Sequence, residues 1–545
     1  MRPLNDSFNE FLKQRHLYQL GGLITERPNP RTENLSTLCQ TDLAQACRVF
    51  RDVEIDALQT LLDKEDLAKA LVGSLRKTLG DGGRIFLVGC GATGRLALVL
   101  ESTWRSLAPA PLAESVIAFT AGGDYALVRS MGVFEDRQDL GGEHLQRLGF
   151  REGDLLIAVT EGGETPFVLG ALERATEMSS VKSWLFFCNP AKLLAETAAR
   201  SKRAMENPRV RWHDFPIEPM ALTGSTRLQA CSVLMSFIGA CFEELLTRAK
   251  PKWIFNETLD LLYRIDPTAL MPLIEHEASA HLRTDNSGFT LHRSQSAAIG
   301  VLTDTTERAP TFSLAAFETQ LEAANHPSLA TLSRTYLEIP GTHSSQDAWL
   351  KLLGRKPRPF LPPEDVILPD GKRPAIDLPQ IYGFDFSESV LNRRAQNGIQ
   401  TSVIIDIEFE GHSDLAFRTS QAADTRPQWE TRFEVGTSSI VRQSILKYLL
   451  NLQSTLAMGR VGRFHGNLMT YVKPTNGKLI DRALRTVRTL LSQPQLSKID
   501  RDPNSFSEDE LLSAVFVAME EVATGEPVAL KALEILRIDQ SSHKR

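Results

Sequence analysis

The stretch Arg84-Ile-Phe-Leu-Val-Gly-Cys-Gly-Ala-Thr-Gly-Arg95 indicates the fold class of this chain. It predicts a buried strand from Ile85 to Val88, a tight turn with three glycines, and a helix that begins near Thr93. Glycines allow positive φ angles and let the backbone approach a ligand closely. The free N–H groups and the dipole of a helix start favour an anion. Taken alone, the pattern fits a dinucleotide, a bare phosphate or simply a close-packed turn.

Short apolar strands continue to alternate with helices beyond this turn. Strands are predicted over residues 84–89, 115–120, 154–160 and 183–188. Helices are predicted over residues 94–107, 140–148, 165–178 and 226–248. This alternation predicts a parallel sheet covered by helices on both faces, so the fold class is doubly wound α/β. Ligands of such sheets bind beyond the carboxyl ends of the strands.

Two more polar loops fall at that edge of the sheet. In Val159-Thr-Glu-Gly-Gly-Glu-Thr-Pro-Phe167, Thr165 can cap a helix whose first residue is Pro166. Leu222-Thr-Gly-Ser-Thr-Arg227 likewise precedes a long helix. Ser and Thr cap many helices, so either loop alone also fits a purely structural role. Together with the glycine turn they predict a phosphate-binding site, formed by Gly91, Ala92, Thr93, Thr160, Gly162, Gly163, Thr165 and Ser225.

The second half of the chain repeats the plan more faintly. Gly288 to His292 would be its first strand and Ser296 to Leu302 the following helix. Glu434-Val-Gly-Thr-Ser-Ser439 precedes an apolar helix, as the loop at 222–227 does. Arg293-Ser-Gln-Ser-Ala297 occupies the place of the glycine turn, so we expect this half to have lost its phosphate loop.

We therefore expect four parts, since 545 residues exceed one ordinary core. These are a helical and extended segment (1–80), a first doubly wound domain with the phosphate loops (81–255), a second, degenerate domain (256–485) and a helical C-terminal cap (486–545). The proline-rich stretch 355–379 is expected to be an ordered surface loop, and Phe506 to Ile538 to form two helices.

Composition excludes several classes of function. The net charge of −6 and the pI near 6.1 give no general attraction to nucleic acid or to an anionic membrane, and no basic helix-turn-helix segment precedes the first domain. No apolar run suggests a membrane span and the N-terminus lacks an apolar signal core, so we expect a cytoplasmic protein.

The six cysteines lack Cys-x-x-Cys spacing and indicate buried free thiols. We expect neither a metal nor a cofactor.

Motifs along most of the chain resemble those of tandem sugar isomerase (SIS) domain proteins, in the group of N-acetylmuramic acid 6-phosphate etherase and the glucokinase regulatory protein. They are Leu23-Ile-Thr-Glu26 with Asn29, the turn Gly89 to Arg95, Ala121-Gly-Gly-Asp124, Glu135-Asp136, Cys188-Asn-Pro190, Thr223-Gly-Ser-Thr-Arg-Leu228, Asp304-Thr-Thr-Glu-Arg-Ala-Pro-Thr-Phe312, Gly466-Asn-Leu-Met469 and Pro474-Thr-Asn-Gly-Lys-Leu479. Residues 313–433 show little to match.

The resemblance implies one composite site. Etherases are single-domain chains that pair as homodimers, with sites shared across the interface. Here the first half keeps the glycine turn and Glu135, but has Thr103 and Met235 where the family has a second glutamate and a lysine. The second half has Glu307 and Lys447 at those positions. Glu135 and Glu307 are thus the implied catalytic pair, and Lys447 an implied ligand-binding residue.

The resemblance implies two functions. One is a carbon–oxygen lyase that acts on N-acetylmuramic acid 6-phosphate or a related amino-sugar phosphate at the composite site. The alternative is a non-catalytic sensor of sugar phosphates that regulates a sugar kinase. An aldose–ketose isomerase is less favoured, since such enzymes typically use a histidine near the sugar. Whether the protein is an enzyme stays open at this stage.

One loop departs from the etherase pattern. Where etherases typically have Ser-Gly-Arg-Thr-Pro, this chain has Gly162-Gly-Glu-Thr-Pro166, and Glu161 adds a second acid. Poorly solvated acids oppose a phosphate by about a kcal/mol or more each. We therefore expect either that their side chains point away or that the ligand is less anionic there.

Overall fold

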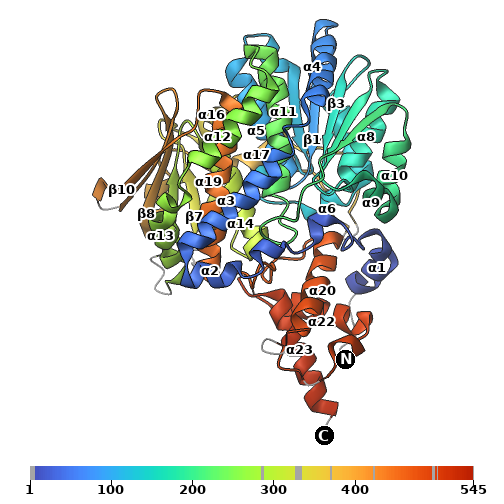
Figure 1. Cartoon of the computed structure of the whole chain (residues 1–545), viewed down its shortest axis with the longest axis vertical. Coiled ribbons are helices and arrows are strands. Elements are labelled where there is room, and N and C mark those ends of the chain that lie inside the picture. The colour runs from blue at the N-terminus through green and yellow to red at the C-terminus, as the bar shows by residue number, and fades with distance from the viewer. Residues whose placement is uncertain are drawn as a thin grey trace.

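The structure is a computed structural model of the chain, and it describes residues 6–283, 288–325, 334–368, 371–421, 424–493, 497–499, 501–523 and 525–543. Two sheets lie on either side of a central group of helices, and a helical cap extends below them (Figure 1). The N- and C-terminal ends both lie at the cap (Figure 1). The two-domain α/β architecture agrees with the prediction.

The first domain contains a five-stranded parallel sheet in the order β2-β1-β3-β4-β5. Its strands are β1 (Ile85–Gly89), β2 (Val116–Thr120), β3 (Leu155–Val159), β4 (Ser183–Phe187) and β5 (Val210–Asp214). Every residue of the first four strands is buried, which is why the sequence predicted them. The edge strand β5 was not predicted, because most of its residues are exposed or half-buried.

Helices follow the strands of the first domain as expected. The long ones are α5 (Ala92–Leu107), α7 (Gln138–Arg147), α8 (Pro166–Met178) and α11 (Gln229–Thr247), with α6 (Gly132–Glu135), α9 (Ala191–Thr197) and α10 (Ala199–Glu206) as shorter ones. Helix α11 is long and apolar enough to span a membrane, which the sequence analysis did not anticipate. Most of it is buried between α5 and the helices over residues 43–59, 65–80 and 439–460, so its apolar character is that of a core helix.

The second domain contains a sheet in the order β10-β9-β8-β6-β7. Its strands are β6 (Phe289–Arg293), β7 (Thr335–Glu338), β8 (Thr401–Glu410), β9 (Asp414–Gln421) and β10 (Asp424–Glu434). The three strands β7, β6 and β8 are parallel and match β2, β1 and β3 of the first sheet. The other two differ from the expected parallel plan, because β8, β9 and β10 form an antiparallel meander.

Several helices belong to the second domain. They are α12 (Pro251–Arg264), α13 (Met271–Leu282), α14 (Ala298–Phe312), α15 (Gln320–Asn325), α16 (Ser345–Leu353), α17 (Leu378–Tyr382), α18 (Val390–Gln396) and α19 (Ser439–Arg460). Helices α14 and α19 pack against α5 and α11 of the first domain. One continuous apolar core therefore runs through both domains.

The turn after β6 is hydrogen-bonded to a carboxylate of the chain itself. The backbone N–H of Gln295 donates to Oε1 of Glu408 at 2.5 Å, and that of Ser296 to Oε2 at 2.9 Å. Glu408 lies on β8, the counterpart of β3. Its carboxylate thus occupies the helix start where a bound phosphate would lie, which gives a physical account of the expected loss of this phosphate loop.

The proline-rich stretch is more than a surface loop, contrary to the sequence-based expectation. Arg355 donates to Oε2 of Glu101 at 2.8 Å and to Oδ2 of Asp124 at 2.5 Å, both in the first domain. Phe360 is buried and stacks on Phe134 with ring centroids 5.0 Å apart. The described part of this stretch, which omits 369–370, therefore binds the first domain.

The N-terminal segment is mainly helical, as predicted. It contains α1 (Asp6–Gln14), α2 (Leu35–Thr41), α3 (Leu43–Gln59) and α4 (Glu65–Gly80). We use the name cap for α20 (Gly477–Leu491), α22 (Glu508–Glu521) and α23 (Val528–His543), so it begins before residue 486, the boundary expected from the sequence. The last two are the helices expected in the tail, and Phe8 of α1 joins the cap helices in a second, separate apolar cluster.

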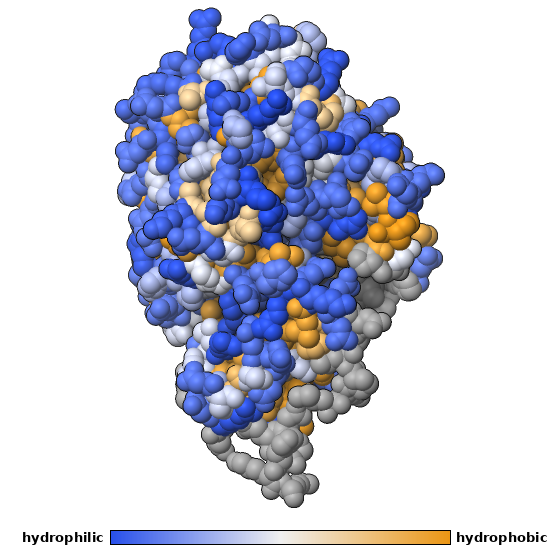
Figure 2. Space-filling view, turned by 90° about the vertical axis from the view of Figure 1, so that its right-hand side faces the viewer, coloured by the Kyte–Doolittle hydropathy of each residue, from blue (hydrophilic) through white to orange (hydrophobic). Residues whose placement is uncertain are grey.

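The face of the molecule in Figure 2 is mostly hydrophilic, with apolar residues in separate patches. All six cysteines are buried and free, as the sequence predicted.

Candidate ligand-binding site between the domains

A cavity of about 130 Å³ lies at the carboxyl end of the first sheet, between the two domains and the cap. We call it the interdomain cavity. The glycine turn, the loops before α8 and α11, helix α14 and the start of α20 all contribute to its wall. Its lining residues include Gly91, Ala92, Arg95, Glu135, Asp136, Glu161, Glu164, Thr165, Ser225, Arg227, Glu307, Asn476, Lys478 and Arg482.

The glycine turn forms one side of the cavity. Gly91 has a φ of +54°, a conformation that side-chain-bearing residues rarely adopt, and a Cβ on Gly94 would lie 2.2 Å from Oγ1 of Thr120. Gly91 and Ala92, which the sequence predicts as phosphate-binding residues, line the cavity. Thr93 is instead buried, and its hydroxyl donates to the carbonyl of Cys90 at 2.9 Å. Thr93 therefore stabilises the turn from behind.

The loop before α8 contributes Thr165 and Pro166 to the wall. The hydroxyls of Thr160 and Thr165 are hydrogen-bonded at 2.8 Å, which orients Thr165. Gly162 and Gly163 shape the loop but are not part of the wall. The carbonyl of Gly162 accepts from Asn189 at 3.0 Å, and Gly163 has a φ of +88°.

Glu164, which replaces an arginine of the etherase pattern, lines the cavity while forming two ion pairs. Its carboxylate lies 2.7 Å from Arg200 and 3.1 Å from Nζ of Lys478. Burial alone would raise the pKa of Glu164, but the two cations lower it. The negative charge of this loop is thus neutralised within the protein.

The loop before α11 is connected to the second domain. The backbone N–H of Thr223 donates to the carbonyl of Asn467 at 2.8 Å. Ser225, which the sequence predicts as a phosphate-binding residue, lines the cavity together with Arg227. The Arg227 guanidinium donates to Oδ1 of Asp304 at 3.0 Å and to Oγ1 of Thr455 at 3.0 Å. This contact fixes the loop against α14 and α19.

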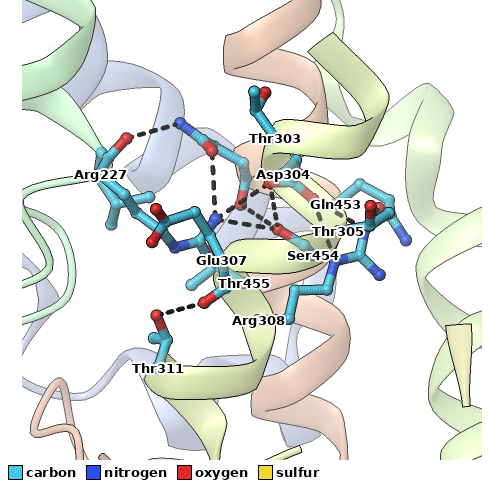
Figure 3. A network of polar contacts seen from close by, with 12 residues as sticks. Arg227, Thr303, Asp304, Thr305, Glu307, Arg308, Thr311, Gln453, Ser454 and Thr455 are labelled. Carbon is cyan, nitrogen blue, oxygen red and sulfur yellow. Dashed lines mark hydrogen bonds and ion pairs between the residues drawn. The ribbon is translucent and has the colours of Figure 1, made fainter. Parts of the chain in front are cut away.

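Asp304 is the centre of the buried polar network in Figure 3. Besides Arg227, it accepts from Arg308 at 2.8 Å and from Ser454 at 3.0 Å. Arg308 in turn is paired with Glu277 and donates to Gln453 at 3.1 Å. This network holds α14 in register with its neighbours, and α14 carries Glu307 (Figure 3).

Glu135 and Glu307 both line the interdomain cavity. Burial, then the neighbouring charge of Asp136, raises the pKa of Glu135 to about 8. Asn476 donates to Oε2 of Glu135 at 3.4 Å. Glu307 accepts from Nη1 of Arg95 at 2.5 Å. The structure therefore brings together the two glutamates that the sequence predicted, one from each domain.

Asp136 also lines the cavity. Its Oδ2 accepts from the backbone N–H of Gly477 at 3.1 Å. Burial raises the pKa of Asp136 to about 6. The first turn of the cap helix α20 is thus hydrogen-bonded to the wall of the cavity.

Lys447 is beside the cavity and not on its wall. Its ammonium donates to the carbonyl of Leu228 at 3.1 Å and to Oγ of Ser232 at 2.8 Å. It lines a second, smaller cavity of about 50 Å³, which shares Arg95 and Glu307 with the interdomain cavity. In this structure Lys447 holds the start of α11.

Sequence reasoning missed a cluster of charges from the cap. Glu26 is buried and accepts from Arg482 at 2.7 Å and from Arg485 at 2.8 Å, both on α20. Burial would raise the pKa of Glu26, but Arg482, Lys478 and Arg485 lower it to about 2. The motifs Leu23 to Glu26 and Pro474 to Leu479 lie far apart in the sequence, and no local pattern indicates that they meet.

Glu161 is the fourth glutamate on the wall, beside Glu135, Glu164 and Glu307, and in the sequence it stands out only as an extra acid in the loop before α8. It is 7% exposed, and its Oε1 is buried without a hydrogen-bond partner. Burial raises its pKa to about 7.

Among the described residues, no cluster of three or more His, Cys, Asp or Glu side chains could hold a metal ion.

Comparison with known proteins yields a family match and several relatives. The model of the glucokinase regulatory protein N-terminal SIS domain matches residues 66–176. N-acetylmuramic acid 6-phosphate etherase of Synechococcus sp. (strain CC9902) is 32% identical over 210 residues, which is 38% of this chain and 61% of the relative. The etherase of Enterobacter sp. (strain 638) is 34% identical over 214 residues, 39% of this chain and 66% of the relative. The alignments thus span less than two thirds of these relatives.

A solved structure is also similar. Tagatose-6-phosphate ketose/aldose isomerase from Escherichia coli aligns with a TM-score of 0.41 at 14% identity, over 76% of this chain and 93% of the isomerase.

Proposed function

Because the chain is an SIS-domain protein, we propose that its interdomain cavity binds a sugar phosphate and that the protein is an etherase-like carbon–oxygen lyase. Its substrate is then N-acetylmuramic acid 6-phosphate or a related amino-sugar phosphate. The etherase relatives, at 32% and 34% identity, support this assignment. One observation carries it: Glu135 of the first domain and Glu307 of the second line a single cavity.

Two carboxyl groups in different environments suit an elimination. In the open-chain sugar, carbon 2 lies beside the carbonyl at carbon 1, so its proton is acidic. One carboxylate takes this proton, the bond between carbon 3 and the ether oxygen breaks, and the other carboxyl protonates the departing D-lactate. Water then adds at carbon 3. Glu135 is buried beside Asp136, whereas Glu307 is paired with Arg95. The two carboxyl groups therefore lie in different environments, as a division into base and acid requires.

The phosphate has a suitable place at the starts of α5 and α8. Helix starts present free N–H groups and a favourable dipole to an anion. The hydroxyls of Thr165 and Ser225 add donors on the same wall, and Lys478 adds a cation. In this proposal Gly91, Ala92, Thr165 and Ser225 contact the ligand. The conformation of the loops is stabilised by Thr93, Thr160, Gly162, Gly163 and Lys447.

The test is release of D-lactate from N-acetylmuramic acid 6-phosphate, measured together with the thermal shift that the same compound produces. Lactate release with turnover would establish the lyase. Solvent deuterium exchange at carbon 2, measured in the Glu135→Gln and Glu307→Gln variants, then identifies the base, because only loss of the base abolishes exchange. Absence of both lactate release and a thermal shift would refute the proposal for this compound.

A second candidate is a sugar-phosphate sensor that regulates a sugar kinase. Two observations favour it: the family match to the glucokinase regulatory protein, and the contribution of the cap residues Asn476 and Lys478 to the cavity wall. Ligand binding in such a protein would be transmitted to the cap. A thermal shift without lactate release supports this candidate.

A further inference from the structure

Residues 355–368, which we call the strap, belong to the second domain but pack on the first. Besides the ion pairs of Arg355, the strap forms a pair of reciprocal contacts with Asp124. The backbone N–H of Arg358 donates to Oδ2 of Asp124 at 2.6 Å, and the backbone N–H of Asp124 donates to the carbonyl of Arg358 at 3.1 Å. These contacts fix the path of the strap two residues before Phe360.

The motif Ala121-Gly-Gly-Asp124, which the proposed function does not use, makes this close approach possible. A Cβ on Gly123 would lie 2.8 Å from the carbonyl oxygen of Arg358 and 3.1 Å from the backbone N of Phe360. Gly123 also has a φ of +63°, which favours glycine. A larger residue at this position would therefore displace the strap.

The strap places Phe360 against helix α6. Phe360 is 1% exposed and stacks on Phe134 of α6, with an interplanar angle of 21°. The ring of His144 meets Phe360 edge-on, with centroids 5.0 Å apart. The backbone of Phe360 is held by Ile376, to which it donates at 3.0 Å and from which it accepts at 2.7 Å. Phe360 is thus a fixed surface on which α6 rests.

Helix α6 (Gly132–Glu135) is a single turn, so packing must set its orientation, since one isolated turn is unfavourable. Phe134 and Glu135 are consecutive, and their side chains leave the helix about 100° apart. Phe134 is buried against the strap, while Glu135 lines the interdomain cavity. On the cap side, a Cβ on Gly132 would lie 2.9 Å from Oγ1 of Thr475. The position of Glu135 therefore depends on what Phe134 packs against.

We propose that Phe360 is a positioning residue, which holds Glu135 in the interdomain cavity by packing on Phe134. The catalytic consequence of this inference rests on the proposed lyase function. The inference gives a role to part of residues 313–433, where the sequence shows little resemblance to the family. It also means that both glutamates are positioned across the domain interface, Glu307 by Arg95 and Glu135 by Phe360.

The first measurement is hydrogen exchange of the full-length protein without ligand. Phe360→Leu keeps an apolar side chain but removes the stacked ring, so the segment 131–137 should exchange at least about tenfold faster than in the wild type. Phe417→Leu is the matched control, because Phe417 is equally buried and packs edge-on against Phe433 in the second sheet. Unchanged exchange in Phe360→Leu, or equal acceleration in the two variants, would overturn the inference.

The second measurement is D-lactate release from N-acetylmuramic acid 6-phosphate. In Phe360→Leu, kcat should fall at least about tenfold while KM stays within about threefold, because the proposed phosphate contacts lie on other loops. In the Glu135→Gln background the same change should lower kcat by less than about twofold, because a residue that acts through Glu135 has no further effect once Glu135 is lost. A loss of the same size in both backgrounds would contradict the positioning role.

The outcomes separate this inference from the proposed function. If the wild type releases no lactate, but the segment 131–137 exchanges faster in Phe360→Leu and not in Phe417→Leu, the lyase is refuted and Phe360 still positions Glu135. If the wild type releases lactate, but neither exchange nor kcat changes in Phe360→Leu, the inference is wrong and the lyase stands.

Discussion

Nη1 of Arg95, on helix α5 of the first domain, donates a 2.5 Å hydrogen bond to Oε1 of Glu307, on helix α14 of the second domain. The two side chains are 4% and 13% exposed. Thr306 strengthens the contact, since its hydroxyl donates to the carbonyl of Leu127 at 2.8 Å. The position of Glu307 in the interdomain cavity therefore depends on the first domain, and neither domain alone would form the site.

Replacing Glu307 with glutamine should abolish most of the proposed lyase activity. General acid–base catalysis contributes roughly 10²- to 10⁴-fold, so we expect a loss of kcat in that range. Sugar-phosphate affinity should change by less than about tenfold, because the phosphate contacts are elsewhere. Steady-state kinetics and calorimetry measure the two effects. Glu275→Gln, an exposed change on α13, serves as the control, and unchanged turnover in Glu307→Gln would remove this residue from the mechanism.

Glu135 should make the protein less stable as the pH rises. Its folded-state pKa of about 8 lies above the ordinary value of 4.5, so the folded state binds more protons than the unfolded state between these values. Relative to Glu135→Gln, the wild type should therefore lose stability from about pH 5 to pH 8 and change little above that. We expect a difference of at least about 1 kcal/mol, since one pKa unit corresponds to about 1.4 kcal/mol. Urea unfolding across this pH range measures it, and a constant difference would contradict the raised pKa.

Glu26 should anchor the cap to the N-terminal segment. Glu26→Gln leaves Arg482 and Arg485 without their buried partner, and breaking such a pair costs about 3–5 kcal/mol. We expect lower stability and faster proteolysis of the cap. Because its folded pKa is lowered to about 2, the contribution of Glu26 is present above pH 4.5 and is lost as the pH falls towards 2.

The control for this prediction is Glu65→Gln. Glu65 pairs with Lys69 and Lys252 at the surface, and such pairs contribute about 0–1 kcal/mol. An equal loss of stability in the two variants would mean that the buried position of Glu26 has no special role.

Each chain should bind one sugar phosphate. The turn after β6 already donates two backbone N–H groups to Glu408, so an external phosphate finds them occupied. Titration calorimetry should give a stoichiometry near one. Two equivalent sites would contradict both this explanation and the composite interdomain site.

Local sequence patterns predicted the elements that surround the site, but not all of its residues. The buried strands β1 to β4 were predicted because they are uninterrupted apolar runs, whereas β5 was missed because Arg211 and Trp212 are exposed. Lys447 was predicted as a ligand contact, and it holds the start of α11 in this structure. In the sequence Lys478 stands out only as part of a motif, because its role depends on a cap helix that packs beside Glu164.

The sequence by itself determined the doubly wound α/β class and the glycine turn, and the resemblance to SIS-domain proteins implied the unequal division of Glu135, Glu307 and Lys447 between the two halves. The strand, the turn and the helix start involve residues close together in the chain, so a linear pattern records them. Only the tertiary structure decided that Arg95 meets Glu307 across 212 positions and that Glu26 meets Arg482 across 456. Such pairs form because whole helices pack their apolar faces together and bring distant charges into one buried region, and no local pattern specifies which charges will meet.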